Sequence, residues 1–443
     1  MRVLVLVDGE HYPSVTRWGI HVARSMGHEV LGALFVGGVE KIAPGELPDV
    51  GVPARSAGSD AAGALAVALA ELAPEAVLDL SDEPVLGYRE RMELAAVTLV
   101  RGVPYLGSDF RLDPPVSGPP LPTPTLAVIG TGKRTGKTAI AGEAARVADR
   151  MGLSPVVVAM GRGGPPKPEV AEAGSVTVER LLELVRRGRH AASDYLEDAL
   201  TAGVTTVGAR RVGGGLAGAP FASNVREAAA VAVGLGAGVV VLEGSGSSVP
   251  PVPWDSGVLV VPASVPPEYL GGYLGPYRLL LSDLLVFTMA SGPDGRAEQL
   301  LALRSHVQRI RGDARFIVTD FEPTPLADVE GRDVFFTTTA PGVVAARQAE
   351  HLGSRYGCRV VGWSARLADR AGLAEDMDNA QMYDTLLTEL KAAAVDVACE
   401  RAIARGADVV FVDNRAVAVE GDADLPTMLA ETIELAVTRS RSR

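Results

Sequence analysis

The sequence predicts an α/β protein that contains a small N-terminal unit and a larger, doubly wound unit with a mostly parallel sheet. Short apolar runs of strand length alternate with stretches of helical periodicity along most of the chain, a pattern typical of parallel strands joined by crossover helices. Residues 113–125 read DPPVSGPPLPTPT and include six prolines, so neither a helix nor a central strand can continue through them. These two observations define the fold class and divide the chain.

The unit before the prolines, residues 1–112, has the pattern of a Rossmann-like α/β domain. It opens with MRVLVLVD, an apolar run that suits a buried parallel strand and is too short for a signal-peptide core. Strand-like and helical stretches then alternate. The stretches expected to be helical are 15–26, 61–73 and 89–101, and those expected to be strands are 30–36 and 76–80.

The unit after the prolines begins a new alternation. We treat residues 113–124 as a semi-rigid linker and residues 125–443 as one larger domain with a C-terminal α/β extension. Three runs in the tail, DVFFTTT, CRVVGWS and DVVFVDN, either extend the main sheet or form a smaller third lobe, and both arrangements stay open at this stage. The other strand-like runs are 155–160, 238–243, 257–262, 284–289 and 315–320.

The composition limits the class of protein and of partner. Of the 443 residues, 47% are hydrophobic and 22% are charged, which is typical of a globular chain. The formal net charge of −12 repels nucleic acid and anionic lipid, and no apolar run reaches the roughly 18 residues of a membrane span. With only Cys358 and Cys399, we expect a cytoplasmic protein, and a homodimer because symmetric dimers are the commonest assembly.

The strongest functional signal is the run GTGKRTGKT at residues 130–138, which lies between an apolar strand and a helical stretch. In that context backbone N–H groups of the turn point at phosphate oxygens, Lys137 reaches the β- and γ-phosphates, and the Thr138 hydroxyl ligates Mg²⁺. The run therefore predicts a P-loop NTPase domain that uses ATP and Mg²⁺, and the alternative is a plain glycine turn that starts a helix. The residues assigned to the nucleotide are Gly130, Thr131, Gly132, Lys133, Arg134, Thr135, Gly136, Lys137, Thr138 and Ala139.

The spacing of this loop departs from the usual one. The standard motif would place its first glycine at position 131, where the chain has Thr131, and Gly130 lies one residue earlier. The longer form G-T-x-x-x-x-G-K-T resembles the loop of the dethiobiotin synthetase branch of P-loop proteins, which carries an additional basic residue within the turn. Either Lys133 or Arg134 would fill that role.

A carboxylate follows another strand at the same predicted sheet edge. The run VVVLEGSGSS delivers Glu243 to the carboxyl end of a strand, where open α/β sheets bind ligands. A carboxylate there would hold Mg²⁺ or polarise a nucleophile, and the following glycines allow the backbone to approach phosphate. The alternative is an acidic residue that merely ends a strand.

Two glycine-rich loops carry the arginines expected to bind anions. MGRGGPPKPE supplies Arg162 and Lys167, and TTVGARRVGGG supplies Arg210 and Arg211; arginine forks bind phosphate bidentately. The first loop is otherwise a solvated surface loop, and the second is otherwise a lid or a simple turn.

In the N-terminal unit, acidic residues follow two strands. The run DGEHYP begins at Asp8, and Asp79 ends another strand. Either they bind substrate at a sheet edge, or they cap helices and turns locally.

Read together, GTGKRTGKT, VVVAMGRGGPPKPE and VVVLEGSGSS resemble the cyclic 2,3-diphosphoglycerate synthetase family, and the resemblance covers nearly the whole chain. It implies ATP-driven cyclisation of 2,3-diphosphoglycerate with release of ADP and phosphate. It also implies that cationic side chains neutralise the phosphates during in-line transfer. The residues assigned to catalysis are Lys137, Arg162, Glu243, Arg210 and Arg211, with Thr138 and Glu243 as metal ligands.

Two other functions remain as alternatives. A carboxylate-activating ligase like dethiobiotin synthetase shares the loop style, but the additional arginine loops favour a polyphosphorylated substrate. A P-loop module that switches conformation with its nucleotide would bind metal or a partner through cysteine or histidine clusters, and the sequence has no such spacing.

Overall fold

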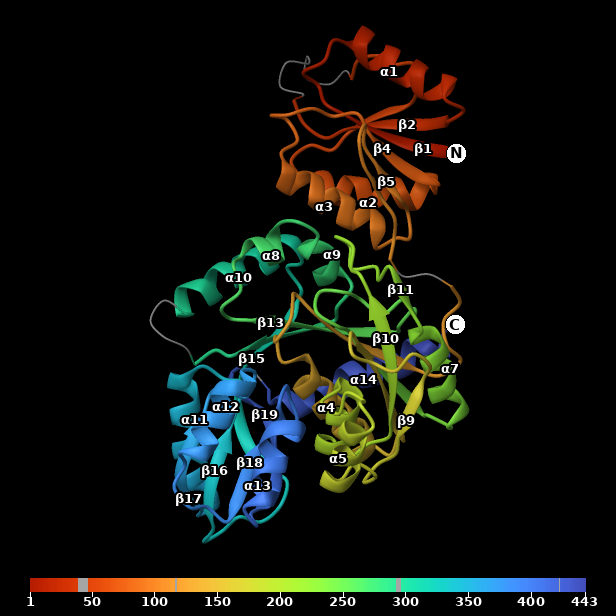
Figure 1. Cartoon of the computed structure of the whole chain (residues 1–443). Helices are drawn as coiled ribbons and strands as arrows, with labels where there is room; N and C mark the ends of the chain where they lie inside the picture. Colours follow the sequence, from red (N-terminus) through yellow and green to blue (C-terminus); the bar gives the residue numbers. More distant parts are fainter. Residues whose placement is uncertain (39–46, 116–117, 292–295, 422) are drawn as a thin grey trace.

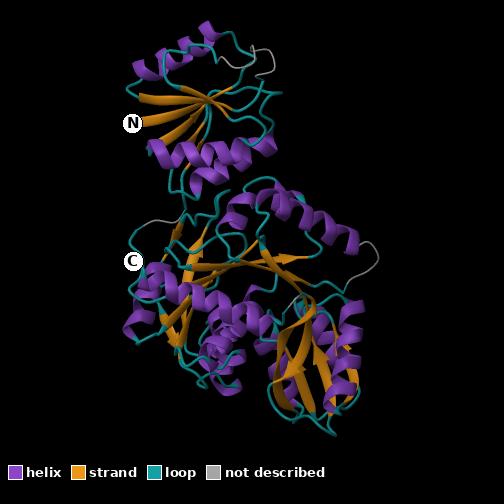
Figure 2. Cartoon of the chain, turned by 180° about the vertical axis from the view of Figure 1, so that it is seen from behind, coloured by secondary structure: helices purple, strands orange, loops and turns teal. Residues whose placement is uncertain are grey.

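A computed structural model describes residues 1–38, 47–115, 118–291, 296–421 and 423–443. Its strands form a six-stranded sheet near the N-terminus and a second, 13-stranded sheet that runs through the rest of the chain. The first sheet stands above the second in Figure 1, and helices cover both sheets in Figure 2. None of the described helices is both long and apolar enough to cross a membrane. The predicted α/β fold class is confirmed.

The N-terminal sheet has the strand order β3-β2-β1-β4-β5-β6. Strands β1 to β5 pair in parallel and β6 pairs antiparallel with β5. The sheet forms because each apolar run is buried on both faces, as β1 shows with five consecutive buried residues. The elements are β1 (Arg2–Val7), α1 (Pro13–Ser25), β2 (Glu29–Phe35), β3 (Ala54–Ser56), α2 (Ala61–Leu72), β4 (Ala76–Asp79), α3 (Tyr88–Leu99), β5 (Tyr105–Leu106) and β6 (Arg111–Leu112).

The large sheet begins with the nucleotide-binding half, in the order β11-β10-β8-β12-β7-β13-β14-β15. Every neighbouring pair from β10 to β15 is parallel, so their carboxyl ends meet at one edge. The strands are β7 (Thr125–Gly130), β8 (Pro155–Gly161), β9 (Glu169–Ala171), β10 (Thr206–Val212), β11 (Ala222–Ser223), β12 (Val239–Glu243), β13 (Ser256–Pro262), β14 (Leu284–Thr288) and β15 (Arg315–Pro325). The helices are α4 (Lys137–Arg150), α5 (Val178–Arg186), α6 (Asp194–Thr201), α7 (Val225–Gly234), α8 (Glu268–Gly271), α9 (Gly275–Leu280) and α10 (Arg296–Ile310).

The C-terminal strands extend the same sheet and also form a lobe of their own. Strand β19 pairs antiparallel with β15, and β18, β16 and β17 then follow in parallel. Figure 1 shows this lobe below the nucleotide-binding half. Its elements are β16 (Asp333–Thr337), α11 (Gly342–Tyr356), β17 (Arg359–Ser364), α12 (Arg370–Asp378), β18 (Thr385–Thr388), the π-helix η2 (Ala394–Cys399), α13 (Glu400–Ala404) and β19 (Asp408–Glu420).

The last helix, α14 (Leu425–Arg441), returns to the nucleotide-binding half. Its buried face includes Leu429 and Ile433, which share a core cluster with Leu126 of β7 and Ile140 of α4. The helix therefore closes one face of the sheet that carries the P-loop.

The N-terminal sheet is attached to the rest through α3. This helix packs on α9, the rings of Tyr88 and Tyr273 lie 6.4 Å apart, and Arg89 pairs with Glu268 at 3.4 Å. Tyr277 of α9 is fully buried in the same apolar cluster as the N-terminal core. The two sheets thus share a packed apolar contact.

Candidate active site

The P-loop connects β7 to α4 and surrounds its own lysine. The Lys137 Nζ donates to the Gly132 carbonyl at 2.7 Å and to the Thr135 Oγ1 at 3.2 Å. Gly136 has a φ of 91°, and a Cβ there would lie 2.3 Å from the Phe321 ring, so this position requires glycine. Burial lowers the pKa of Lys137 to about 8. The loop presents an ammonium group and the start of a helix to an anion.

Next to this loop, a hydroxyl and a carboxylate form a site suited to a hard cation. The Thr138 Oγ1 donates to the Glu243 Oε1 at 2.7 Å, although the two residues come from α4 and β12. Glu243 is 3% exposed, and burial, followed by repulsion from Asp194, raises its pKa to about 7. Its Oε2 is buried and, apart from the neighbouring Asp198 carboxyl, has no hydrogen-bond partner among the described residues. Oxygen ligands of these two kinds fit Mg²⁺, so Thr138 and Glu243 would hold it.

The sequence analysis missed a group of carboxylates on α6 beside Glu243. Asp198 is fully buried, and burial together with Glu243 raises its pKa well above the ordinary value. Burial also raises the pKa of Glu197 to about 7, although Glu197 pairs with Lys391 at 3.3 Å. The available signal was the run DYLED, whose acidic residues lie three and four positions apart and therefore share one face of a helix.

Three cationic side chains converge on the glycine turn after β12. A Cβ on Gly246 would lie 3.1 Å from the Arg211 Nη2, 3.7 Å from the Lys133 Cγ and 4.0 Å from the Arg162 Nη2. Arg211 is only 5% exposed, and its Nε has no partner among the described residues. Its pKa is lowered, first by burial and then by Arg162. Two guanidinium groups held this close beside the P-loop, with the Lys133 side chain next to them, form a site for a multiply charged anion.

Arg210 lies apart from this cluster. Side chains of adjacent strand residues point to opposite faces, and β10 contains both Arg210 and Arg211. The Arg210 Nε donates to the Gly164 carbonyl at 2.6 Å, and its backbone N–H donates to the Asn224 Oδ1 at 2.6 Å. Asn224 also donates to the Pro165 carbonyl at 3.2 Å. Arg210 and Asn224 therefore hold the loop that carries Arg162.

The acidic residues of the N-terminal sheet make local bonds. Asp8 accepts from the backbone N–H groups of Glu10, His11 and Asp82, at 3.0, 3.2 and 2.9 Å. Asp79 accepts from the Arg91 Nε at 2.8 Å. These contacts favour local capping over a substrate role.

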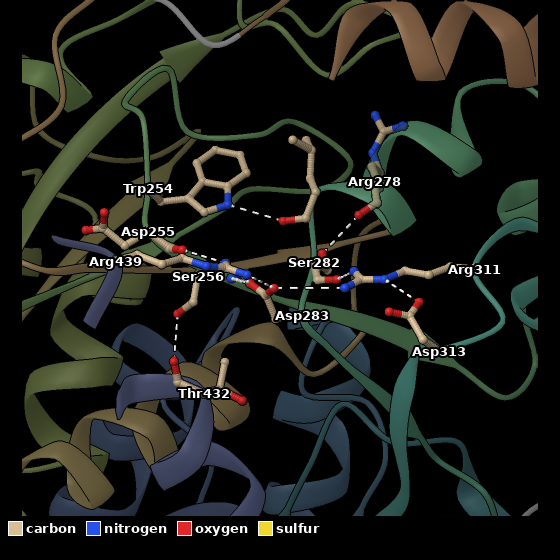
Figure 3. Close-up of polar contacts among 12 residues, drawn as sticks. Trp254, Asp255, Ser256, Arg278, Ser282, Asp283, Arg311, Asp313, Thr432 and Arg439 are labelled. Carbon is tan, nitrogen blue, oxygen red and sulfur yellow. Dashed lines mark hydrogen bonds and ion pairs between the residues drawn. The ribbon is translucent and has the colours of Figure 1, made fainter. Parts of the chain in front are cut away.

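A cavity of about 420 Å³ lies at the opposite edge of the large sheet, between the end of α3 and the start of β13 and β14. Its charged groups are paired within the protein, as Figure 3 shows. Arg439 donates to both carboxylate oxygens of Asp283 at 2.9 Å, and the Trp254 Nε1 donates to the Leu281 carbonyl at 3.3 Å. The convergent cations that have no carboxylate partner among the described residues lie at the P-loop edge instead.

Three family models match the chain in succession. They describe the N-terminal domain of cyclic 2,3-diphosphoglycerate synthetase over residues 2–113, its P-loop domain over residues 125–320 and its C-terminal domain over residues 325–415. The chain belongs to the cyclic 2,3-diphosphoglycerate synthetase family. Family membership confirms the predicted resemblance and the predicted enzyme class, a synthetase with a P-loop domain.

Curated relatives extend over almost the whole chain. The cyclic 2,3-diphosphoglycerate synthetase of Rubrobacter xylanophilus is 50% identical over 424 residues, 94% of this chain and 95% of that protein. That of Methanothermus fervidus is 39% identical over 449 residues, 98% of this chain and 97% of that protein. Among solved structures, the hydrogenase maturation factor HypB from Archaeoglobus fulgidus matches 45% of this chain and 82% of its own with 14% identity and a TM-score of 0.28, too distant to bear on function.

Proposed function

We propose that this member of the family uses Mg-ATP to cyclise 2,3-diphosphoglycerate, releasing ADP and phosphate. The observation that carries the proposal is the cluster of Lys133, Arg162 and Arg211 around Gly246, next to Lys137 of the P-loop. A substrate with two phosphates and a carboxylate needs several cations in one place, and an otherwise acidic chain supplies them here.

The reaction needs two displacements. An oxygen of one substrate phosphate attacks the γ-phosphorus of ATP, and the bond from that phosphorus to the β-γ bridging oxygen breaks, so that ADP leaves. The product is a phosphoanhydride on the substrate. An oxygen of the second substrate phosphate then attacks the substrate phosphorus of this anhydride, the ring closes, and inorganic phosphate leaves.

The side chains act by position and charge. Lys137 and the backbone N–H groups at the start of α4 hold the β- and γ-phosphates, and Thr138 and Glu243 would hold Mg²⁺, which supplies charge neutralisation at those phosphates. Arg162, Arg211 and Lys133 hold the substrate phosphates close together against their mutual repulsion, so that the attacking oxygen is in line. Arg210 supports this arrangement through the Gly164 carbonyl.

This chemistry is distinct from carboxylate activation. A carboxylate-activating ligase presents one or two negative charges to its site, whereas the two guanidinium groups and the Lys133 side chain at Gly246 match a polyphosphate. We further propose a cytoplasmic homodimer. Both cysteines are free and buried, which suits a reducing compartment.

The test is phosphorus NMR of the full-length protein with Mg-ATP and 2,3-diphosphoglycerate, followed by kinetics of an Arg162→Ala variant. New anhydride resonances should grow together with equal amounts of ADP and phosphate. Loss of a charge-assisted contact costs about 1.5–3 kcal/mol, so Arg162→Ala should raise the KM for 2,3-diphosphoglycerate about ten- to hundredfold and leave the KM for ATP unchanged.

The matched control is Arg187→Ala, which removes the same charge just after the end of α5, where Arg187 is exposed and pairs with Glu183. It should behave like the wild type. Substrate resonances that stay fixed while ATP persists would contradict the substrate assignment. An equal rise in the KM for ATP would assign Arg162 to the nucleotide instead.

A further inference from the structure

Helix α6 directs acidic side chains at the P-loop. Asp194 is its first residue, and Asp198 lies one turn later on the same face. A Cβ on Gly161, at the end of β8, would lie 3.3 Å from the Asp194 Oδ2. The Asp194 carboxyl lies close enough to repel Glu243. The Asp198 carboxyl is also close to Glu243 and shares a hydrogen bond with it. The helix thus brings negative charge close to Lys137 and Glu243.

The fixed cations nearby make their short contacts with other groups. Lys391 pairs with Glu197 at 3.3 Å, and Arg211 donates to two loop carbonyls. Lys137 donates to the Gly132 carbonyl and, in the proposed complex with ATP, binds the β- and γ-phosphates. Asp194 has neither a hydrogen bond nor an ion pair within the described part of the chain. Lys137, Lys391 and Arg211 attract Asp194 over a longer range. Among the described residues, however, Glu197 is the one α6 carboxylate with an ion-pair partner.

Buried acceptors at this place are also without donors. The Asp198 and Glu243 carboxyls lie close enough to share a proton. Apart from that contact, the Glu243 Oε2 and both oxygens of Asp198 have no hydrogen-bond partner among the described residues, and neither does the buried Thr131 hydroxyl oxygen. A buried carboxylate oxygen without a partner is costly. A hydrated cation would satisfy such oxygens, because both the ion and its waters approach carboxylates favourably.

The arrangement fits an ion that keeps its water. No group of three or more His, Cys, Asp or Glu in the described ranges lies close enough together to hold a metal directly. Mg²⁺ commonly binds through one or two carboxylates together with phosphates, and retains several waters. A carboxylate outside direct reach then contacts the bound waters and orients them.

We propose that Asp194 binds the Mg²⁺ of the nucleotide through a water molecule, while Thr138 and Glu243 contact the ion more closely. This inference rests on the proposed use of Mg-ATP and is independent of the identity of the substrate. It gives α6 a positioning role, since Asp194 fixes the ion relative to the transferred phosphate.

The experiment measures Mn²⁺ binding by calorimetry to the full-length protein saturated with ADP, without 2,3-diphosphoglycerate. Asp194→Asn should weaken Mn²⁺ binding about ten- to hundredfold, the usual cost of removing an indirect metal contact. Asp194→Glu keeps the charge and should recover part of the affinity. Glu183→Gln removes an exposed charge from α5 and should bind Mn²⁺ like the wild type.

The outcomes separate the two proposals. If the wild type binds Mn²⁺ with ADP and Asp194→Asn binds it equally well, the role of Asp194 is wrong and the proposed function stands. If the wild type itself binds no Mn²⁺ with ADP, the Mg-nucleotide part of the proposed function fails as well. A thermal melt verifies that each variant is folded, and Asp194→Ser replaces Asp194→Asn if that variant does not fold.

Discussion

Gly164→Ala provides a sharp test of how the Arg162 loop is held. A Cβ on Gly164 would lie 1.9 Å from the Ala209 carbonyl oxygen and 2.6 Å from its carbonyl carbon. Carbon and oxygen approach to about 3.3 Å in favourable contacts, so the loop would have to move by roughly 1.4 Å. Both neighbours are backbone atoms of strand β10, which is held between β8 and β9, and cannot yield. We therefore expect the loop, and Arg162 with it, to be displaced.

The displacement predicts the size of the effect. A misplacement of about 1 Å in a catalytic arrangement can cost about 100-fold in rate, so kcat/KM for 2,3-diphosphoglycerate should fall by at least that factor. Overpacking should also lower the free energy of unfolding by about 1–3 kcal/mol. Steady-state kinetics and urea unfolding measure the two effects separately.

The matched control is Gly234→Ala at the end of α7. No atom lies within 4 Å of a Cβ at Gly234, and alanine favours a helix by up to about 1 kcal/mol, so activity should be unchanged and stability equal or slightly higher. Wild-type kcat/KM and stability in Gly164→Ala would refute the assignment of Arg162 to the site through this loop.

Three other predictions follow from contacts away from that loop. Lys137→Ala should abolish turnover, measured as ADP release, while the far-UV circular dichroism stays that of the wild type. Arg146→Met should lower the free energy of unfolding in urea by about 3 kcal/mol, the lower end of the cost of breaking a buried ion pair. The substitution removes the 3.1 Å contact between Arg146 and Asp413 and leaves Asp413 with its 3.5 Å contact to Arg415. Burial raises the pKa of Cys399 to about 12, so a thiol reagent at pH 8 should label no cysteine in the folded protein and both cysteines in guanidinium. Because folding disfavours the Cys399 thiolate, the free energy of unfolding should fall as the pH rises above the ordinary pKa of a thiol.

The fold class and one edge of the site could be predicted from the sequence because both depend on local patterns. Apolar runs that alternate with helical stretches give a parallel sheet, and parallel strands place the ends of β7 and β12 at one edge. The contact between the Thr138 hydroxyl and Glu243, 105 residues apart in the chain, follows from that rule. Whether these residues bind metal and nucleotide stays a prediction until it is measured.

The different positions of the Arg210 and Arg211 side chains could be predicted only once both residues were known to lie in a strand. The run TTVGARRVGGG has the glycine content of a loop, yet Thr206–Val212 is strand β10. The strand contains Gly208 because the Tyr195 ring leaves no room for a side chain there: a Cβ at this position would lie 2.7 Å from the ring. Alternation along the strand then separates the two arginines, which a loop would not do.

The C-terminal runs and the α6 carboxylates could not be placed for a different reason. The pairing of β15 with β19 joins Pro325 to Val412, a long-range contact that no local pattern specifies. DYLED reads as an ordinary acidic helix start until α6 is packed against α4 and β8. Tertiary packing, rather than propensity, decides both.

The position of α14 has a consequence for the order of folding. Leu429 and Ile433 complete the core around Leu126 and Ile140, some 300 positions earlier in the chain. During synthesis, the strand that leads to the P-loop emerges long before the helix that covers it. One apolar face of the sheet therefore stays uncovered until the last residues of the chain have been made. Such non-local closure slows folding and exposes intermediates to aggregation. The nucleotide site should therefore mature late, and a chaperone that shields the uncovered sheet should increase the yield of active enzyme.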